Sequence, residues 1–90
     1  MTLDEYRQQI LDYIRHTTSS QSAIEKVNEA NRVLFESNIS DFNKRQFWTH
    51  LYNELDNLTL YKIERQGAAS LSAIISAAQA VIAAHLNSIK

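Results

Sequence analysis

The scarcity of glycine and proline constrains this fold more than any other feature of the sequence. The chain has no proline, and its one glycine is Gly67. Sheets and loop-built sites usually need both residue types at their turns, because glycine reaches backbone angles that other residues avoid and proline fixes a turn. We therefore expect an all-α protein whose long helices are joined by short polar connectors.

Apolar stripes and capping residues predict two helices in the first half of the chain. The Thr2–Glu5 pair forms a capping box, which places a first helix over residues 3–15. Its inner face should hold a stripe of large side chains, namely Leu3, Tyr6, Ile10 and Ile14. A second capping box at Ser22–Glu25 follows a hydroxyl-rich connector and places the next helix over residues 23–36.

The second half of the chain predicts two longer helices, over residues 41–66 and 68–89, with Gly67 as the residue that ends the first of them. The polar sequence at 56–59 leaves open whether residues 41–66 form one helix or two. Two successive helical hairpins then pack as a four-helix bundle, and residues 1–90 form a single domain.

The last predicted helix is almost entirely apolar and carries no Asp, Glu, Lys or Arg between residues 68 and 89. One side has a heptad-spaced seam, which consists of Leu71, Ile75, Ala78, Ile82, His85 and Ile89. The other side has small residues that let a neighbouring backbone approach, at Ala73, Ala77, Ala80 and Ala84. Such a helix is covered by lipid or by protein. Its length suits a bilayer, but Gln79 and the dilution by alanine and serine favour protein.

Self-association through this helix is the leading expectation. The first two helices carry narrow apolar stripes, and three helices of this kind do not readily cover both sides of an apolar fourth. Leftover apolar surface usually indicates a partner. The alternative is that residues 68–89 form the central helix of a monomeric bundle.

No residue pattern predicts catalysis or a cofactor. The chain has no cysteine, and His16, His50 and His85 share no motif. His50 and Glu54 stand four residues apart on one helical face, but a zinc site needs three or four ligands. One glycine cannot build a phosphate-binding loop. We therefore expect a non-enzymatic protein with no metal and no cofactor, in which His85 is hydrogen-bonded in the interior or at an interface.

Aromatic residues gather around the connector between the second and third helices. They are Phe35, Phe42, Phe47, Trp48 and Tyr52. Core packing between the helices is one interpretation of this group. The other is a patch for a protein partner formed by Phe47, Trp48 and Tyr52, because Trp and Tyr often anchor interfaces. Phe47 and Trp48 are adjacent and point about 100° apart on a helix, so both are buried only if the helix is broadly covered.

The charge of the chain argues against a nucleic-acid partner. The formal net charge is −1 and the isoelectric point is about 6.3, so no basic surface is expected to attract phosphate. The amino-terminal residues "MTLDEYRQQ" lack the basic and apolar regions of a secretory signal. We therefore expect a cytoplasmic location.

Four stretches in the centre of the chain form an ordered pattern: "IEKVNEAN" (24–31), "SD" (40–41), "FWT" (47–49) and "LDNLTLYKI" (55–63). In this order they resemble the Hha/YmoA family of small helical bacterial regulators. The Asp-His-Arg signature of that family is absent, and "YNE" (52–54) stands in its place. The resemblance implies a cytoplasmic protein that binds a nucleoid-structuring partner and modulates transcription.

These observations together favour a small regulatory or inhibitory protein that self-associates and acts by covering a protein target. Three other classes stay open at this point. The chain fits a structural or assembly subunit of a larger complex, such as one of phage origin. It also fits a transcription modulator like the Hha proteins, or a membrane-active protein anchored by residues 68–89.

Overall fold

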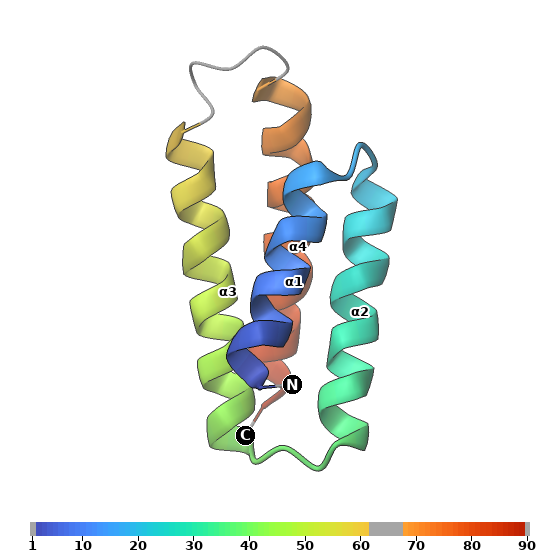
Figure 1. Cartoon of the computed structure of the whole chain (residues 1–90), viewed down its shortest axis with the longest axis vertical. Coiled ribbons are helices and arrows are strands. Elements are labelled where there is room, and N and C mark those ends of the chain that lie inside the picture. The colour runs from blue at the N-terminus through green and yellow to red at the C-terminus, as the bar shows by residue number, and fades with distance from the viewer. Residues whose placement is uncertain (1, 62–67, 90) are drawn as a thin grey trace.

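The computed structural model describes residues 2–61 and 68–89, and within these ranges every regular element is a helix. The four helices are α1 (Leu3–His16), α2 (Ser20–Glu36), α3 (Asp41–Tyr61) and α4 (Ala68–Ser88). They run alternately up and down and pack side by side (Figure 1). The prediction of an all-α bundle of four helices is confirmed.

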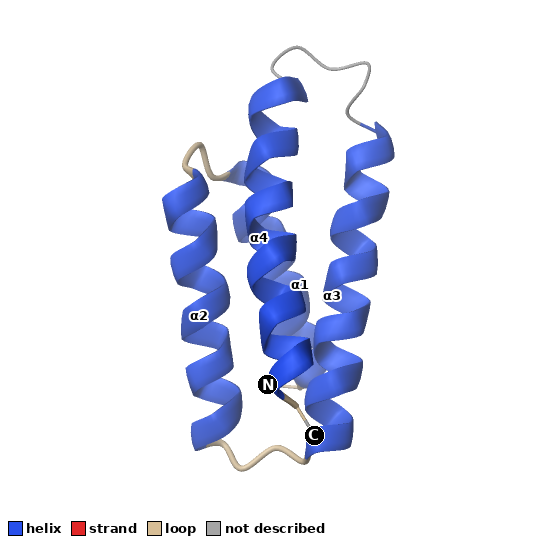
Figure 2. Ribbon diagram, turned by 180° about the vertical axis from the view of Figure 1, so that it is seen from behind, coloured by secondary structure: helices blue, strands red, loops and turns tan. Residues whose placement is uncertain are grey.

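The helices are arranged so that α1 and α4 lie on opposite sides of the bundle, with α2 and α3 between them at the two flanks. Figure 1 shows α1 in front, and Figure 2 shows the same bundle from behind with α4 facing the viewer. Helix α4 packs mainly against α2 and α3 and also contacts α1. It is therefore the element that holds the other three together.

Side-chain caps explain where the helices begin. Thr2 and Glu5 form the predicted capping box of α1, with N–O distances of 3.0 and 3.1 Å. The predicted start of α2 is wrong by three residues. Ser19 is its N-cap, because the Ser22 amide donates to the Ser19 hydroxyl at 3.3 Å, so Ser22 lies inside the helix. At α3, the Ser40 hydroxyl accepts from the Asn43 amide at 3.2 Å.

The end of α2 shows how a chain with so little glycine terminates a helix. Asn38 adopts a left-handed conformation with φ of 59°, which asparagine tolerates better than most residues. The Ile39 amide then donates to the Leu34 carbonyl at 3.3 Å, and the Asn38 amide donates to the Phe35 carbonyl at 3.2 Å. This is the Schellman arrangement, and it turns the chain sharply toward α3.

The third helix runs unbroken through residues 56–59, so the possible break at that point is absent. The prediction that it continues to residue 66, and that Gly67 ends it, lies outside the described residues.

An ion pair joins the middle of α3 to α1, because Arg7 Nε donates to Glu54 Oε1 at 3.1 Å. Arg7 also binds Asp4 at 2.7 Å, so one guanidinium joins two carboxylates across the α1–α3 contact.

The core is made by one side of each helix. Its fully covered members include Trp48 and a set of aliphatic side chains, namely Ile10, Ile14, Val27, Leu34, Leu51, Leu55, Ile75 and Ile82. Three alanines with no exposed surface, Ala23 and Ala30 on α2 and Ala78 on α4, leave room for the close approach of these two helices. The seam side of α4 therefore faces the interior of its own chain.

Two substitutions on α4 test this orientation. Ala78→Glu places a carboxylate without a partner in the core, and we expect it to lower the free energy of unfolding by about 3–5 kcal/mol. Ala80→Glu introduces the same side chain two residues away at an exposed position, and we expect a change within about 0.5 kcal/mol. Urea denaturation followed by circular dichroism measures both. Equal losses in the two variants would contradict the orientation of α4.

Candidate functional site

The six residues of the predicted self-association seam lie along the inner side of α4. Ile75, Ala78 and Ile82 have exposed fractions of 1, 0 and 0 %, and the other three are partly buried. Because the chain's own helices cover the centre of the seam, a second copy could reach it only if the bundle opened. A single chain does not test self-association through these six residues, but the seam forms part of the core of its own chain.

His85 is the polar member of the seam, and it joins three helices. Its Nε2 lies 3.1 Å from Asn28 Oδ1 on α2, which makes Nε2 the donor. Its ring stacks on Trp48 of α3, with 5.4 Å between the ring centroids and 25° between the planes. Burial lowers the pKa of His85 below its usual value, because the charged imidazolium loses hydration there. His85 is therefore a neutral hydrogen-bond donor at the centre of the α2–α3–α4 contact near neutral pH.

The predicted partner patch is closed by the chain itself. Phe47 and Trp48 have exposed fractions of 2 and 0 %, and Tyr52 is partly buried. Both adjacent aromatics are covered because α1 and α4 lie on different sides of α3: Phe47 stacks on Tyr6 of α1 at 6.0 Å, and Trp48 stacks on His85 of α4. Core packing is thus the correct interpretation for these two residues, and they are not available as surface anchors.

Trp48 is held by ring stacking and core packing, without a hydrogen bond from its indole N–H to any described residue. Its edge meets Phe47 at 5.0 Å and an interplanar angle of 87°, an arrangement that aromatic pairs favour. Its indole N–H is buried and has no acceptor among the described residues. Buried polar groups are normally satisfied, so this donor carries a desolvation cost that the stacking and packing must exceed.

The outward side of α4 is lined by small uncharged residues. Along residues 71–86 the exposed positions are Ala73, Ser76, Ala80 and Ala84, and we refer to these four residues as the alanine face; Asn87 and Ser88 are exposed at its end. Next to them, Gln79 binds α3, where its Nε2 donates to the Tyr52 carbonyl at 3.1 Å and approaches Asp56 Oδ1 at 3.4 Å. The amide of Gln79 thus serves to fix α4 against α3.

Among the residues whose burial the structure describes, three large apolar side chains are exposed, and the sequence did not single them out as a surface. Phe35 and Phe42 have exposed fractions of 74 and 69 %, and Tyr13 has 41 %. The signal for two of them was present in the helical period. Phe35 follows Leu34 of the buried α2 stripe by one residue, and Phe42 lies outside the stripe that continues through Leu51 and Leu55 on α3.

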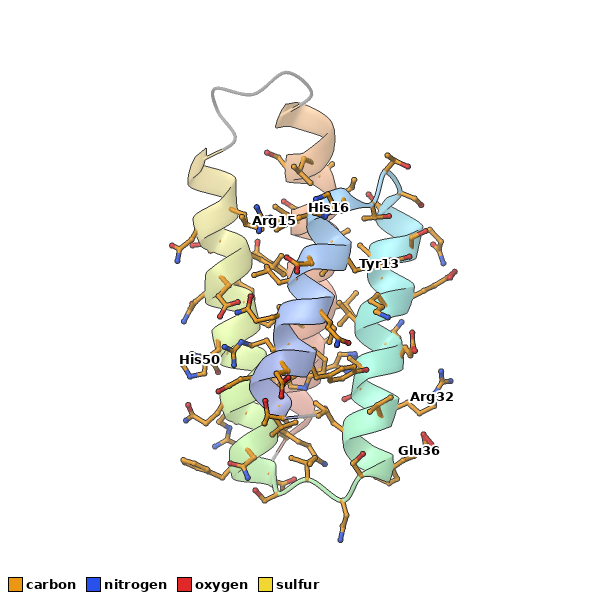
Figure 3. All side chains as sticks on the ribbon, viewed as in Figure 1. Tyr13, Arg15, His16, Arg32, Glu36 and His50 are labelled. Carbon is orange, nitrogen blue, oxygen red and sulfur yellow. The ribbon has the colours of Figure 1, made fainter. Side chains whose placement is uncertain are left out.

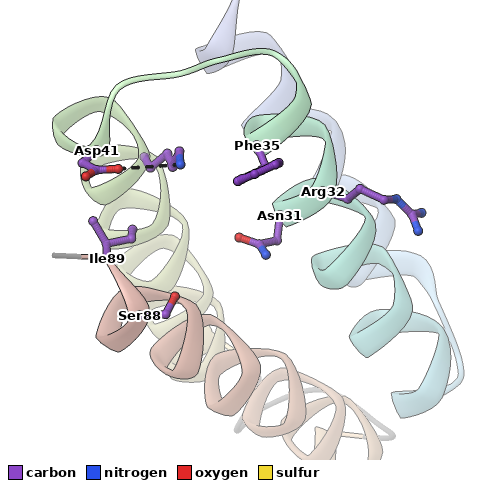
Figure 4. Close-up of a pocket in the computed structure, with 7 residues that line it drawn as sticks. Asn31, Arg32, Phe35, Asp41, Ser88 and Ile89 are labelled. Carbon is purple, nitrogen blue, oxygen red and sulfur yellow. Dashed lines mark ion pairs between the residues drawn. The ribbon is translucent and has the colours of Figure 1, made fainter.

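Two hollows lie at the end of the bundle where α2 joins α3. The larger has a volume of about 550 Å³ and opens on the side of α4 (Figure 4). It is lined by Asn31, Arg32, Phe35, Asp41, Lys44, Ser88 and Ile89. The smaller has a volume of about 330 Å³ and lies between α1 and α2. Its lining is mostly apolar and consists of Thr2, Leu3, Tyr6, Val33, Leu34, Ser37 and Ile39.

In the part of the chain that the structure describes, the remaining titratable residues do not gather into a chemical site. His50 points away from the bundle (Figure 3), and Glu54, its predicted neighbour, binds Arg7 and Gln8 instead. His16 Nδ1 lies 2.8 Å from the Asp12 carbonyl in its own helix. Within residues 2–61 and 68–89, no three side chains of His, Cys, Asp or Glu form a group that could hold a metal ion.

One helix of the described chain is long and apolar enough to cross a membrane, as judged by length and composition alone. It is the segment Leu71–Ser88, of which 22 % of the residues are buried inside the bundle. The core helix of a soluble protein meets the same criterion. This observation therefore keeps a membrane among the partners to be tested.

Comparisons with protein-family models, with curated proteins and with solved structures found no match for this chain. The resemblance of the central region to the Hha/YmoA family is therefore neither supported nor contradicted and stays a prediction. In this structure, two of the three residues of its "FWT" stretch, Phe47 and Trp48, belong to the core.

The position of His85 predicts a pH dependence of stability. A lowered pKa means that the unfolded chain binds a proton more readily than the folded chain does. The free energy of unfolding should therefore fall as the pH drops below about 6.5, the ordinary histidine value, until the lowered pKa of the folded state is passed. His85→Gln, which keeps a donor for Asn28, should reduce this slope when urea denaturation is compared between pH 7 and pH 5.

The exposed His50 provides the matched control. His50→Gln removes another imidazole from the same bundle but leaves the contact of His85 with Trp48 intact. We expect its pH slope to equal that of the unchanged chain. A slope that responds to His50→Gln and not to His85→Gln would contradict the assignment.

Proposed function

We propose that this chain is a small non-enzymatic protein-binding module that associates with a second copy through the alanine face of α4. In this proposal the paired module acts by covering a protein target, as inhibitors and regulators do. The contact lies on the side of α4 opposite the seam, because the bundle uses the seam for its own core. The absence of charge from the exposed side of α4 is the observation that carries the proposal.

The other three helices carry charged residues on their solvent-exposed sides. Exposed charged side chains project from α1, α2 and α3, among them Arg15, Arg32 and Glu36 (Figure 3). Helix α4 extends for 21 residues without an Asp, Glu, Lys or Arg. Surface helices normally carry charges on their outer side, so this difference sets α4 apart.

Small size and lack of charge make the alanine face suited to a second helix. Ala80 and Ala84 have short side chains, so another backbone can approach closely. No charge has to be desolvated when it does so, which removes a cost that charged interface residues would impose. A second copy presents the same surface, and a two-fold axis brings the two together in one isologous contact.

A membrane is the second candidate partner, and the segment Leu71–Ser88 favours it by length and composition. Insertion across a bilayer would require α4 to leave the core that it forms with α2 and α3. Contact through the alanine face alone would leave the bundle intact, but alanine contributes little to partitioning into lipid. Protein is therefore the better occupant of this face.

Ala80→Glu tests the proposed contact, because this position is exposed in the single chain. We expect the unchanged protein to form at least a dimer in size-exclusion chromatography with light scattering. The variant should shift the equilibrium at least about tenfold toward the single chain, since two carboxylates would meet without a partner at the two-fold axis. Its circular dichroism should stay unchanged, and so should its urea midpoint at a concentration low enough for both chains to be single.

Glu25→Gln is the matched control, because it alters charge at an exposed position of α2 without touching α4. Particles of many copies would favour an assembly subunit over a paired regulator. Co-sedimentation with vesicles of neutral and anionic phospholipid tests the membrane. The proposal would be overturned if the molecular mass of the soluble protein were the same with and without Ala80→Glu. Recovery of the protein mainly with the vesicles would also overturn it.

A further inference from the structure

The end of the bundle where residues 37–40 connect α2 to α3 carries a second surface, which we call the connector end. It combines an exposed aromatic ring with an apolar hollow of suitable size. We propose that a second copy of this chain docks at the connector end, with Phe35 of each copy inserted into the α1–α2 hollow of the other. This contact is separate from the alanine face and does not depend on it.

The inserted group is the ring of Phe35. It is 74 % exposed at the end of α2, although its hydrophobic surface would favour burial. Figure 4 shows it directed toward the ion pair of Asp41 with Lys44, whose distance is 3.7 Å. The Lys44 ammonium lies 5.6 Å from the ring centroid, within the range of a cation–π contact. The ring is therefore held in place while most of its surface stays in water.

The receiving group is the hollow between α1 and α2, which has a volume of about 330 Å³. Its walls are formed by large apolar side chains, among them Leu3, Val33, Leu34 and Ile39. Apolar cavities of about 150 Å³ in other proteins accept benzene, so a phenyl ring fits here by volume. Aromatic side chains that fill such pockets are typical anchors of protein interfaces.

The relative positions of ring and hollow suit a two-fold contact. Phe35 lines the hollow on the side of α4, whereas the receiving hollow lies on the side of α1, across the connector. A two-fold axis perpendicular to the long axis of the bundle turns the second copy end to end and exchanges these two sides. Each ring then meets the hollow of the other copy, and the same contact forms twice.

The charges beside the two groups are complementary in this arrangement. Arg32 and Lys44 line the hollow that contains Phe35, together with the single acid Asp41. Asp4 and Glu5, both exposed, lie in the first turn of α1 beside the receiving hollow. Lys44 is already paired with Asp41, and Asp4 with Arg7, so Arg32 of one copy and Glu5 of the other are the charges that the end-to-end contact brings together. Opposite charges that meet in this way favour the pairing and set its orientation.

The turn of the connector places the Phe35 ring and the receiving hollow on opposite sides of it. Its turn is fixed by the amides of Asn38 and Ile39, which donate to carbonyls in the last turns of α2. Leu34, at the start of that turn, lines the receiving hollow together with Ile39, while Phe35 projects on the other side. Little backbone ordering is left for association, and pre-ordered surfaces bind with a smaller entropic cost.

Sedimentation velocity over a concentration series tests the proposal, with Ala80→Glu as the background so that the alanine face cannot contribute. We expect this single variant to form a concentration-dependent dimer. Adding Phe35→Ala should weaken that dimer at least about tenfold, because an aromatic anchor is removed. Phe35 is exposed, so the fold should not change. The matched control is Tyr13→Ala, which removes an exposed aromatic from the opposite end of α1 and should leave the dimer unaffected.

A second variant blocks the hollow instead of removing the ring. Val33→Phe is expected to fill the receiving hollow with a side chain of the same copy and to weaken the dimer by a similar factor. A mixture of the Phe35→Ala and Val33→Phe chains should associate more strongly than either alone. One copy keeps its ring and the other keeps its hollow, so one of the two contacts can form.

Two results would overturn the proposal. One is an Ala80→Glu chain that stays single up to about 1 mM, a concentration at which even a weak contact would be populated. The other is a dimer in this background that is insensitive to Phe35→Ala. Neither result bears on the contact through the alanine face. That contact is tested separately, by comparing the association of the unchanged chain with that of the Ala80→Glu variant.

Discussion

Burial of the aliphatic side of α4 is the interaction on which the rest of the bundle depends. Ile75 and Ile82 are almost fully covered, and each such side chain contributes about 1.5–3 kcal/mol when it leaves water. Helix α4 contacts each of the other three helices, whereas α2 and α3 barely touch one another. Removal of α4 would leave three amphipathic helices without a common core. The orientation of this one helix therefore determines which surfaces the protein can offer.

The aromatic contacts convert this general burial into a defined packing. Tyr6, Phe47, Trp48 and His85 form a continuous row from α1 through α3 to α4. Aliphatic side chains alone tolerate small shifts of one helix along another, whereas stacked rings have preferred distances and angles. The bond from His85 to Asn28 extends the row to α2. All four helices are thereby fixed in register around one polar group, and the burial of His85 at that position lowers its pKa.

Helix number and most helix boundaries could be predicted, because caps and apolar stripes are local properties of the sequence. The start of α2 could not be predicted, because Ser19 and Ser22 both suit an N-cap. Only the backbone conformation shows that Ser19 takes this position. The candidate site was harder to predict. Whether Phe47 and Trp48 are buried depends on how broadly other helices cover α3, and that coverage is a property of the whole bundle. Phe35 belongs to the same aromatic group, and its position one residue outside the α2 stripe is the local signal of its exposure.

The two proposed contacts lie on different parts of the molecule, and their positions limit the assemblies that can form. The alanine face runs along the side of the bundle, whereas Phe35 and its receiving hollow lie at one end. Each contact is isologous and closes a pair of chains when it acts alone. A chain that uses both must join pairs to pairs. If the two axes cross at right angles, four chains close into a tetramer. Certain smaller crossing angles close larger particles, and axes that do not cross continue the pairs as a string. The relative placement of the two two-fold axes therefore decides whether this small bundle forms a closed particle or a filament.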